Sequence, residues 1–288
     1  MKKRYLFIVS MLCMLFVLVG CGSGENKVAS ADGAKDPKAL MEKAGEKLAN
    51  IDSFEMAMNI DMGMDVKDQG NVQIKMTADA STIMKPKMLM DMNMKMDMTM
   101  GEENQAIEMR QIMDGSGDEM VIYQNMFGAW SKISAGESLG MEELVQNPQD
   151  MMKTYTESME KIEITGDKTV NGKDCYEITM TLGEESMNAI MEQMGGMESL
   201  LGVSASELES SKEILDLFKD AEFVFYIDKQ NEEFVGMYME LGEILKKAIA
   251  MSGEGEDIGD CTMSIEAIYK SYNSVKEIVI PEEAKSAE

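Results

Sequence analysis

The residues that could carry chemistry are unusual because histidine is absent and methionine is abundant. The 288 residues include 34 methionines, 4 cysteines and no histidine. Without histidine, Ser-His-Asp catalysis and ordinary zinc or copper(II) sites are excluded. Ser138 stands in a G-x-S-x-G motif at residues 136–140, but no histidine could accept its hydroxyl proton. We therefore expect a protein that is not an enzyme, with Ser138 as a helix cap.

The methionines follow a period of two. Over residues 54–66 and again over residues 88–100, apolar side chains occupy every even position and mostly polar ones lie between them. This alternation is typical of a strand with one buried face. The candidate residues of an apolar ligand cavity on this face are Met56, Met58, Met62, Met64, Met88, Met90, Met92, Met94, Met96 and Met98.

Three interpretations of these methionines stay open. As core residues, each would contribute roughly 1.5–3 kcal/mol on burial, although β-branched and aromatic residues are commoner in strands. The flexible, polarizable thioether side chain also suits an adaptable cavity for a lipid or another apolar molecule. Thioethers are soft ligands of copper(I), but the stripe is too long and continuous for one three-coordinate site. We expect no resident cofactor or metal.

Two acidic, glycine-rich segments, residues 114–119 and 254–260, have the composition of calcium loops. The first has oxygen ligands at alternate positions but lacks the distant bidentate glutamate of an EF-hand. We interpret both segments as solvated turns.

The amino-terminal twenty residues have the zones of a secretory signal. Lys2, Lys3 and Arg4 precede an apolar run over residues 5–19. The run ends in Leu-Val-Gly-Cys at residues 18–21, which resembles the lipobox of bacterial lipoproteins. This resemblance implies cleavage after residue 20 and a diacylglycerol on Cys21, so that the protein is anchored to the outer face of the cell membrane.

A polar segment over residues 21–35 follows the signal and is typical of a flexible tether. A coil of this length spans on the order of 20 Å, so the folded domain is expected beside the bilayer. The formal charge of -26 excludes nucleic acid as an electrostatic partner. We expect a monomer.

Two cysteines, Cys175 and Cys261, remain in the predicted mature body. Each follows an aspartate at the expected start of a strand. An exterior compartment permits a disulfide between them, and two free thiols are the alternative.

The remaining patterns predict one domain over residues 36–281 and a polar tail over residues 282–288. Asp36 and Pro37 begin a helix, and Asn171-Gly172 is a favoured hairpin turn between strands at 161–170 and 173–182. We predict helices from Ser138 onward, in an insert at 184–219 and at 243–251. Further strands are expected at 72–80, after a turn at Gly70-Asn71, and at 107–113, 120–123, 129–133, 221–228, 233–241, 261–270 and 275–280.

The order of these elements resembles that of lipoproteins of Gram-positive bacteria related in fold to LolA, LolB, LppX and LprG. The resemblance lies in Ser53-Phe54, Lys85-Pro86, Trp130-Ser131-Lys132 and residues 273–281. It implies an α+β fold: a strongly curved antiparallel β half-barrel with helices covering the concave face. Members such as LolA and LppX hold acyl chains or lipidated molecules there. The density of methionine departs from that pattern, and no catalytic residue is carried over.

Overall fold

A computed structural model describes residues 35–67, 70–101, 103–117, 120–135, 159–183, 217–251 and 258–287. The predicted signal, Cys21 and the predicted tether up to residue 34 lie outside the described residues. The same holds for the helices predicted from Ser138 onward and for residues 184–216 of the predicted insert. Within the described chain, no helix is both long and apolar enough to cross a membrane.

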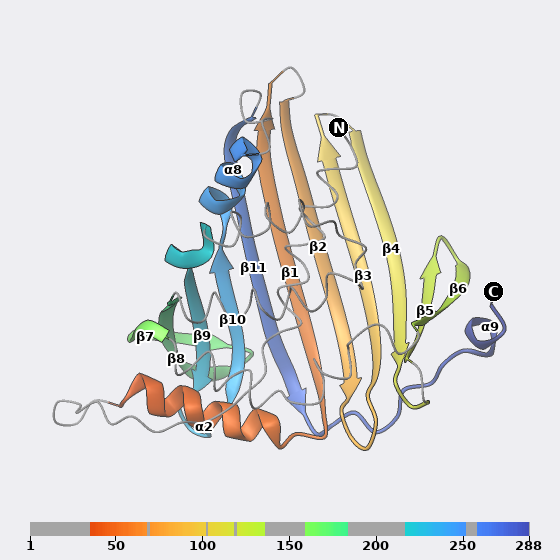
Figure 1. The fold of residues 1–288 in the computed structure, drawn as a ribbon, viewed down its shortest axis with the longest axis horizontal. Helices are drawn as coiled ribbons and strands as arrows, with labels where there is room; N and C mark the ends of the chain where they lie inside the picture. The colour runs from red at the N-terminus through yellow and green to blue at the C-terminus, as the bar shows by residue number, and fades with distance from the viewer. Residues whose placement is uncertain are drawn as a thin grey trace.

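The described chain is built on one open antiparallel sheet (Figure 1). Its strands are β1 (Ser53–Val66), β2 (Gly70–Ile83), β3 (Leu89–Met100), β4 (Glu103–Asp114), β5 (Met120–Met126), β6 (Ala129–Ala135), β7 (Met159–Val170), β8 (Lys173–Leu182), β9 (Glu222–Asp228), β10 (Phe234–Glu240) and β11 (Ile258–Tyr272). The helices are α2 (Pro37–Ala49), the 3-10 helix η3 (Leu217–Asp220), α8 (Gly242–Met251) and α9 (Glu282–Lys285).

The sheet consists of two meanders that meet at its centre. The strand order is β6-β5-β4-β3-β2-β1-β11-β10-β9-β8-β7, so the first and last strands of the described chain pair with each other. At about 3.3 Å per residue, the 14 residues of β1 extend roughly 45 Å. Sheets twist, and in Figure 1 β7 and β8 turn away from the plane in which β1 to β4 lie.

Two tight turns have the backbone conformation that suits a two-residue hairpin. Asn171 and Gly172 have φ of 49° and 74°, and Phe127 and Gly128 have φ of 54° and 83°. Both pairs lie in the left-handed region required by a type I′ turn. The hairpin predicted at Asn171-Gly172 is confirmed. In the other predicted hairpin, over residues 120–133, β5 and β6 directly flank the turn at Phe127-Gly128.

The first helix also begins as predicted. Asp36 is the N-cap, with its carboxylate accepting a hydrogen bond of 3.0 Å from the backbone N–H of Lys38, and Pro37 opens the helix. Leu40, Met41 and Ala44 are buried in the main core. In Figure 1, α2 lies across the ends of β9 and β10.

The segment after β11 corrects the predicted strand at 275–280 and the predicted polar tail. Residues 274–280 form no strand, because β11 is already paired along both edges with β1 and β10. The apolar side chain of Ile280 instead packs beside Ile112 and Tyr123 of β4 and β5. Ala284 of α9 is fully buried in the same cluster, so the expected tail is docked against the sheet.

The close approach of β10 to its neighbours depends on Gly236. A Cβ at this position would lie 2.5 Å from the backbone oxygen of Ala267 and 2.7 Å from Cδ1 of Ile268. We expect Gly236→Ala to lower the free energy of unfolding by about 1–3 kcal/mol through overpacking, measured by urea denaturation.

The matched control is Gly166→Ala in β7, where the nearest atom to an added Cβ is Glu177 Oε1 at 3.5 Å, an ordinary contact. This change should alter the free energy of unfolding by about 0.5 kcal/mol or less. Equal losses for the two variants would show that close packing against β11 is not the reason for glycine at 236.

Candidate functional site

Cross-strand pairing joins the predicted methionines into one continuous apolar layer. Ile60 of β1 lies opposite Met76 of β2 and opposite Ile265 of β11. The row continues outward through Met96, Ile107, Met239, Phe223, Met180 and Ile162. Directly opposed side chains have Cβ atoms about 4.5–5.5 Å apart, so the layer is unbroken from β4 to β7.

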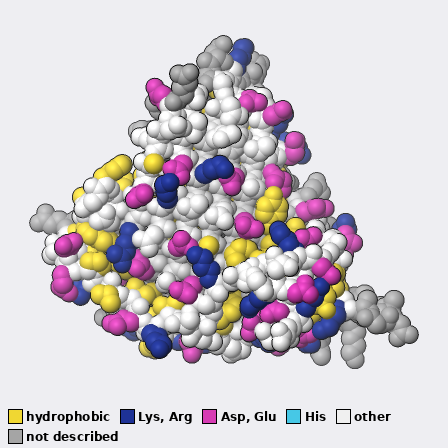
Figure 2. All heavy atoms as spheres, turned by 180° about the vertical axis from the view of Figure 1, so that it is seen from behind, with side chains coloured by type: hydrophobic (Ala, Val, Ile, Leu, Met, Phe, Trp, Pro, Cys, Tyr) yellow, Lys and Arg dark blue, Asp and Glu magenta, His cyan; other side chains and the backbone are white. Residues whose placement is uncertain are grey.

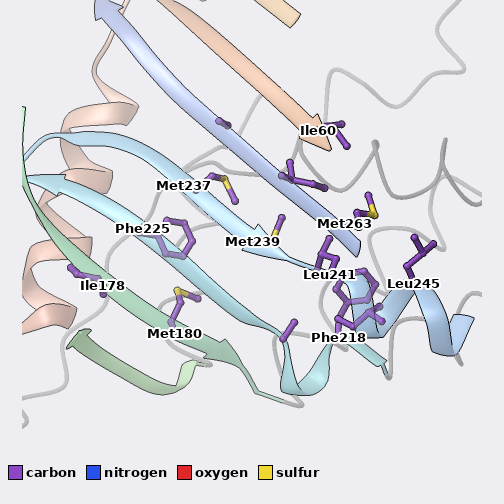
Figure 3. Close-up of a cluster of buried hydrophobic side chains, with 14 of the residues drawn as sticks. Ile60, Ile178, Met180, Phe218, Phe225, Met237, Met239, Leu241, Leu245 and Met263 are labelled. Carbon is purple, nitrogen blue, oxygen red and sulfur yellow. The ribbon is translucent and has the colours of Figure 1, made fainter. Parts of the chain in front are cut away.

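The part of this layer on β8 to β11 and β1 is a filled core. Met62 is 4 % exposed, and its cross-strand partner Met263 is 1 % exposed. Helix α8 closes this region with Ile244, Leu245 and Ile249. Figure 3 shows the side chains of these strands pointing to one side of the sheet, where Phe218 and Leu245 meet them.

The part of the layer on β3 and β4 is less covered. Met90, Met92, Met94, Met96 and Met98, which we call the methionine face, are all only half-buried, and Met88 just before β3 is half-buried too. Among the described residues, the clusters of buried side chains include none of these six. Exposure therefore increases along the layer, and Met100 at the end of β3 reaches 41 %.

The predicted cavity residues thus divide into two groups. Met62 belongs to the buried core, and Met56, Met58 and Met64 are partly buried against it. The methionine face on β3 lies beyond them, on the far side of β2. The shared face of the sheet agrees with the alternation in the sequence, but a cavity lined by all ten residues is an untested prediction.

Amide side chains interrupt the apolar layer on β4 and β5. Gln111 lies opposite Met92, and Gln105 lies opposite Met98. The side-chain amide of Gln124 donates a hydrogen bond of 2.6 Å to the sulfur of Met109. A mainly apolar layer with a few polar groups is typical of a binding site, since it offers contact area and a small number of orienting hydrogen bonds.

The opposite face of β1 to β4 is mostly polar, except at one end, where Leu89 and Ile112 belong to the buried cluster that contains Ala284 of α9. Lys75 lies 3.2 Å from Asp61, and the guanidinium of Arg110 binds both carboxylate oxygens of Asp91 at 2.9 and 2.8 Å. The hydrogen bonds that the guanidinium donates to Asp91 raise the pKa of Arg110. Figure 2 shows this face from behind, with charged side chains of both signs and several patches of hydrophobic side chains among other side-chain and backbone atoms. Solvent therefore contacts most of one side of the long strands, and the continuous apolar layer lies on the other.

Cys175 and Cys261 are both free thiols, so the possible disulfide between them is absent. Cys175 lies in a separate buried cluster with Val170 and Tyr226, whereas Cys261 lies in the main core. Strands β9 and β10 lie between their strands, a gap of about 14 Å across the sheet. Cys175 is also level with Asp228 at the end of β9, whereas Cys261 lies near the start of β11 opposite Met64, so the two thiols are well beyond the reach of a disulfide. Burial raises the pKa of both thiols.

A cleft of about 450 Å³ lies away from the methionines, where α2 meets the ends of β10 and β11. It is lined by Ala44, Glu46, Lys47, Leu48, Asn50, Ile51, Glu233, Phe234, Tyr272 and Asn273. The sequence did not predict it, because its lining comes from three separate segments, and none of them has a ligand-binding motif.

Comparisons with known proteins place the chain in a family. The model of DUF6612, a family of unknown function, matches residues 36–288. The chain belongs to this family. No curated protein sequence matches it.

Several solved structures are similar to the chain over most of its length. The lipoprotein LppX of Mycobacterium tuberculosis is 14% identical, with 84% of this chain and 97% of that chain covered and a TM-score of 0.39. LprF from Mycobacterium bovis is 12% identical, with 86% and 97% covered and a TM-score of 0.41. A LolA superfamily protein from Nitrosomonas europaea is 11% identical, with 81% and 92% covered and a TM-score of 0.22. LppX and the LolA superfamily, which the sequence resemblance named, are thus among the structures matched.

The two buried thiols generate a prediction for the lipid-free mature chain, by which we mean residues 21–288 with Cys21→Ser. Because burial raises their pKa, little reactive thiolate forms near neutral pH. We expect iodoacetamide to alkylate Cys175 and Cys261 at least tenfold more slowly in the folded chain than in urea, as measured by mass spectrometry.

Thermal unfolding provides the second measurement on the same chain. Addition of dithiothreitol should leave the Tm unchanged, since there is no disulfide to reduce. A drop in Tm with reductant, or fewer than two thiols titrated after unfolding, would contradict the structure.

Proposed function

We propose that this protein binds a lipid or another apolar molecule on its methionine face, as a non-enzymatic lipoprotein on the outer side of the cell membrane. The observation that carries the proposal is the change in burial along one apolar layer. Ile265 and Met263 lie under α8 and are at most 1 % exposed, whereas the methionine face in the same layer stays half-buried. An apolar surface that is not fully covered by its own chain is a common mark of a binding site.

The residue type supports the proposal. Methionine has three rotatable side-chain bonds and a polarizable sulfur, so a methionine surface adapts to ligands of irregular shape. The pairs across β3 and β4 include Met94 with Met109 and Met90 with Met113, which widens the adaptable surface to two strands. Rigid β-branched side chains, which strands normally favour, would not adapt in this way.

The predicted anchor supports the same function. A diacylglycerol on Cys21 and a tether of roughly 20 Å would keep the domain beside the bilayer, where lipids are concentrated. In this proposal, the helical segments predicted from Ser138 onward and at residues 184–219 cover the methionine face on the concave side of the sheet. The domain would act as a monomer.

Copper(I) binding is a second candidate, and one observation favours it. On β1 and β11, Met64 lies opposite Cys261, and Met62 lies opposite Met263. Two adjacent cross-strand pairs thus bring three thioethers and one thiol together, all soft ligands. Burial of Cys261 weighs against this site, because the raised pKa keeps its thiol protonated until a metal displaces the proton.

The apolar-ligand proposal predicts that a charge on the methionine face weakens binding. In the lipid-free mature chain, we expect Met94→Glu to reduce the affinity for a dansyl-labelled undecanoic acid about tenfold or more, because ligand binding would desolvate the carboxylate. The measurement is a fluorescence titration.

Asn93→Glu is the matched control, because it adds the same charge at the neighbouring position on the opposite, exposed face of β3. Its affinity should stay within about twofold of the unsubstituted chain. If the unsubstituted chain binds neither this probe nor a neutral acyl compound such as 1-lauroylglycerol, or if both variants weaken binding equally, apolar-ligand binding on this face is wrong.

The copper(I) candidate is tested under reducing conditions by competition with a chromogenic copper(I) chelator. If the candidate is right, each chain binds one copper(I) with a Kd below about 1 μM, and Met64→Leu abolishes this binding. Met94→Leu removes a thioether from the methionine face instead and should retain the metal. If Met64→Leu retains the metal and Met94→Leu loses it, the metal site lies on β3 instead. No binding at all would eliminate the candidate, and a structural role in the envelope would remain if the fatty-acid probe also failed to bind.

A further inference from the structure

One polar atom is buried in the apolar layer without a partner. The side chain of Thr82 is 1 % exposed, and its hydroxyl oxygen Oγ1 makes no hydrogen bond to any residue that the structure describes. A hydroxyl removed from water without a hydrogen bond is costly, and nearly all buried polar groups are satisfied by protein, water or ligand. The position of Thr82 therefore needs a physical explanation.

The register places Thr82 at one end of the methionine face. On β2 it lies opposite Phe54 of β1 and opposite Met90 of β3. The other side chains of β2 on this face, at alternate positions from Val72 to Ala80, are all apolar. Thr82 is thus the one hydroxyl that β2 contributes to the layer.

The residues that lead to Thr82 have short side chains between long ones. Ala80 lies between Met56 on β1 and Met92 on β3, and Ala78 is flanked by methionines in the same way, Met58 and Met94. A methionine side chain extends three atoms beyond its Cβ, whereas an alanine ends there. The layer therefore contains a strip of short side chains, bordered by thioethers on both sides, with a hydroxyl at its end. Ala78 and Ala80 are each 5 % exposed, so the strip is covered in this structure, and flexible methionine side chains must turn aside to admit a ligand.

We infer that Thr82 donates a hydrogen bond to the carbonyl oxygen of an acyl ester or amide whose hydrocarbon chain lies along this strip. The inference rests on the proposed function and narrows its ligand class. The neighbours of the hydroxyl on this face, Phe54, Met90 and Ala80, are all uncharged. A free carboxylate would be desolvated there without a cation, so a neutral ester or amide fits better.

An ion pair close to Thr82 in the sequence does not change this preference. Lys85, three residues after Thr82, lies 3.6 Å from Asp52, and the two side chains are 53 % and 72 % exposed. Lys85 is already paired and solvated, so it offers a buried carboxylate little stabilisation. Recognition at Thr82 would therefore depend on one neutral hydrogen bond and on the fit of the chain.

The test compares two amphiphiles that differ only in the carbonyl group: 1-lauroylglycerol, an ester, and 1-O-dodecylglycerol, an ether. Their affinities for the lipid-free mature chain are measured by calorimetry below the micelle concentration. We expect Thr82→Val to weaken binding of the ester about fivefold and to leave the affinity for the ether unchanged. Thr82→Ser keeps the hydroxyl and should preserve the preference for the ester.

The unliganded protein provides an independent readout. Valine has nearly the shape of threonine and leaves no unpaired hydroxyl, so Thr82→Val should keep or raise the Tm. A fall of several degrees would mean that the hydroxyl is bonded within the protein, and the inference would be overturned.

The binding data separate the two levels of the argument. If the unsubstituted chain binds both amphiphiles and Thr82→Val weakens both equally or neither, the role of Thr82 is wrong and the proposed function stands. If the chain binds neither amphiphile nor the dansyl probe, both the proposed function and this inference are wrong.

Discussion

The register of β1 against its two neighbours is the constraint on which the rest of the structure depends. Met62 lies opposite Ile74 of β2 and opposite Met263 of β11, so one pairing aligns the apolar positions of both meanders. Side chains alternate with a period of two, and a slip by one residue would turn every methionine of β1 toward solvent. The polar pairs on the other face, such as Lys75 with Asp61, oppose the same slip.

Because both meanders share this register, they build one layer with two environments. On the β11 side, α8 and α2 cover the layer, and Ile265 is fully buried. On the β3 side, the same type of face stays half-buried along its methionines. The contrast arises from which elements pack on each part, since the alternation of apolar and polar residues is the same in both.

The chemistry of the layer is that of contact and orientation. It combines thioethers, a few amides such as Gln111, and the buried hydroxyl of Thr82. The thiol of Cys261 is held protonated by burial, so it is a weak nucleophile. The chain has no histidine, the commonest general base, and the groups of this layer offer apolar contact and hydrogen bonds to the neutral acyl compound that we propose as the ligand.

The sequence alone determined the faces and the local geometry, because period-two alternation and turn residues act over a few positions. The strand over residues 54–66, the cap at Asp36 and the turn at Asn171-Gly172 needed no distant partner to be recognised. It could not determine which strands lie side by side, since apolar strands of similar pattern pair equally well in many orders. Only the tertiary structure decided that β1 meets β11 and that Cys175 and Cys261 lie apart. It also decided that Thr82 is buried among methionines, because burial is set by elements far away in the chain.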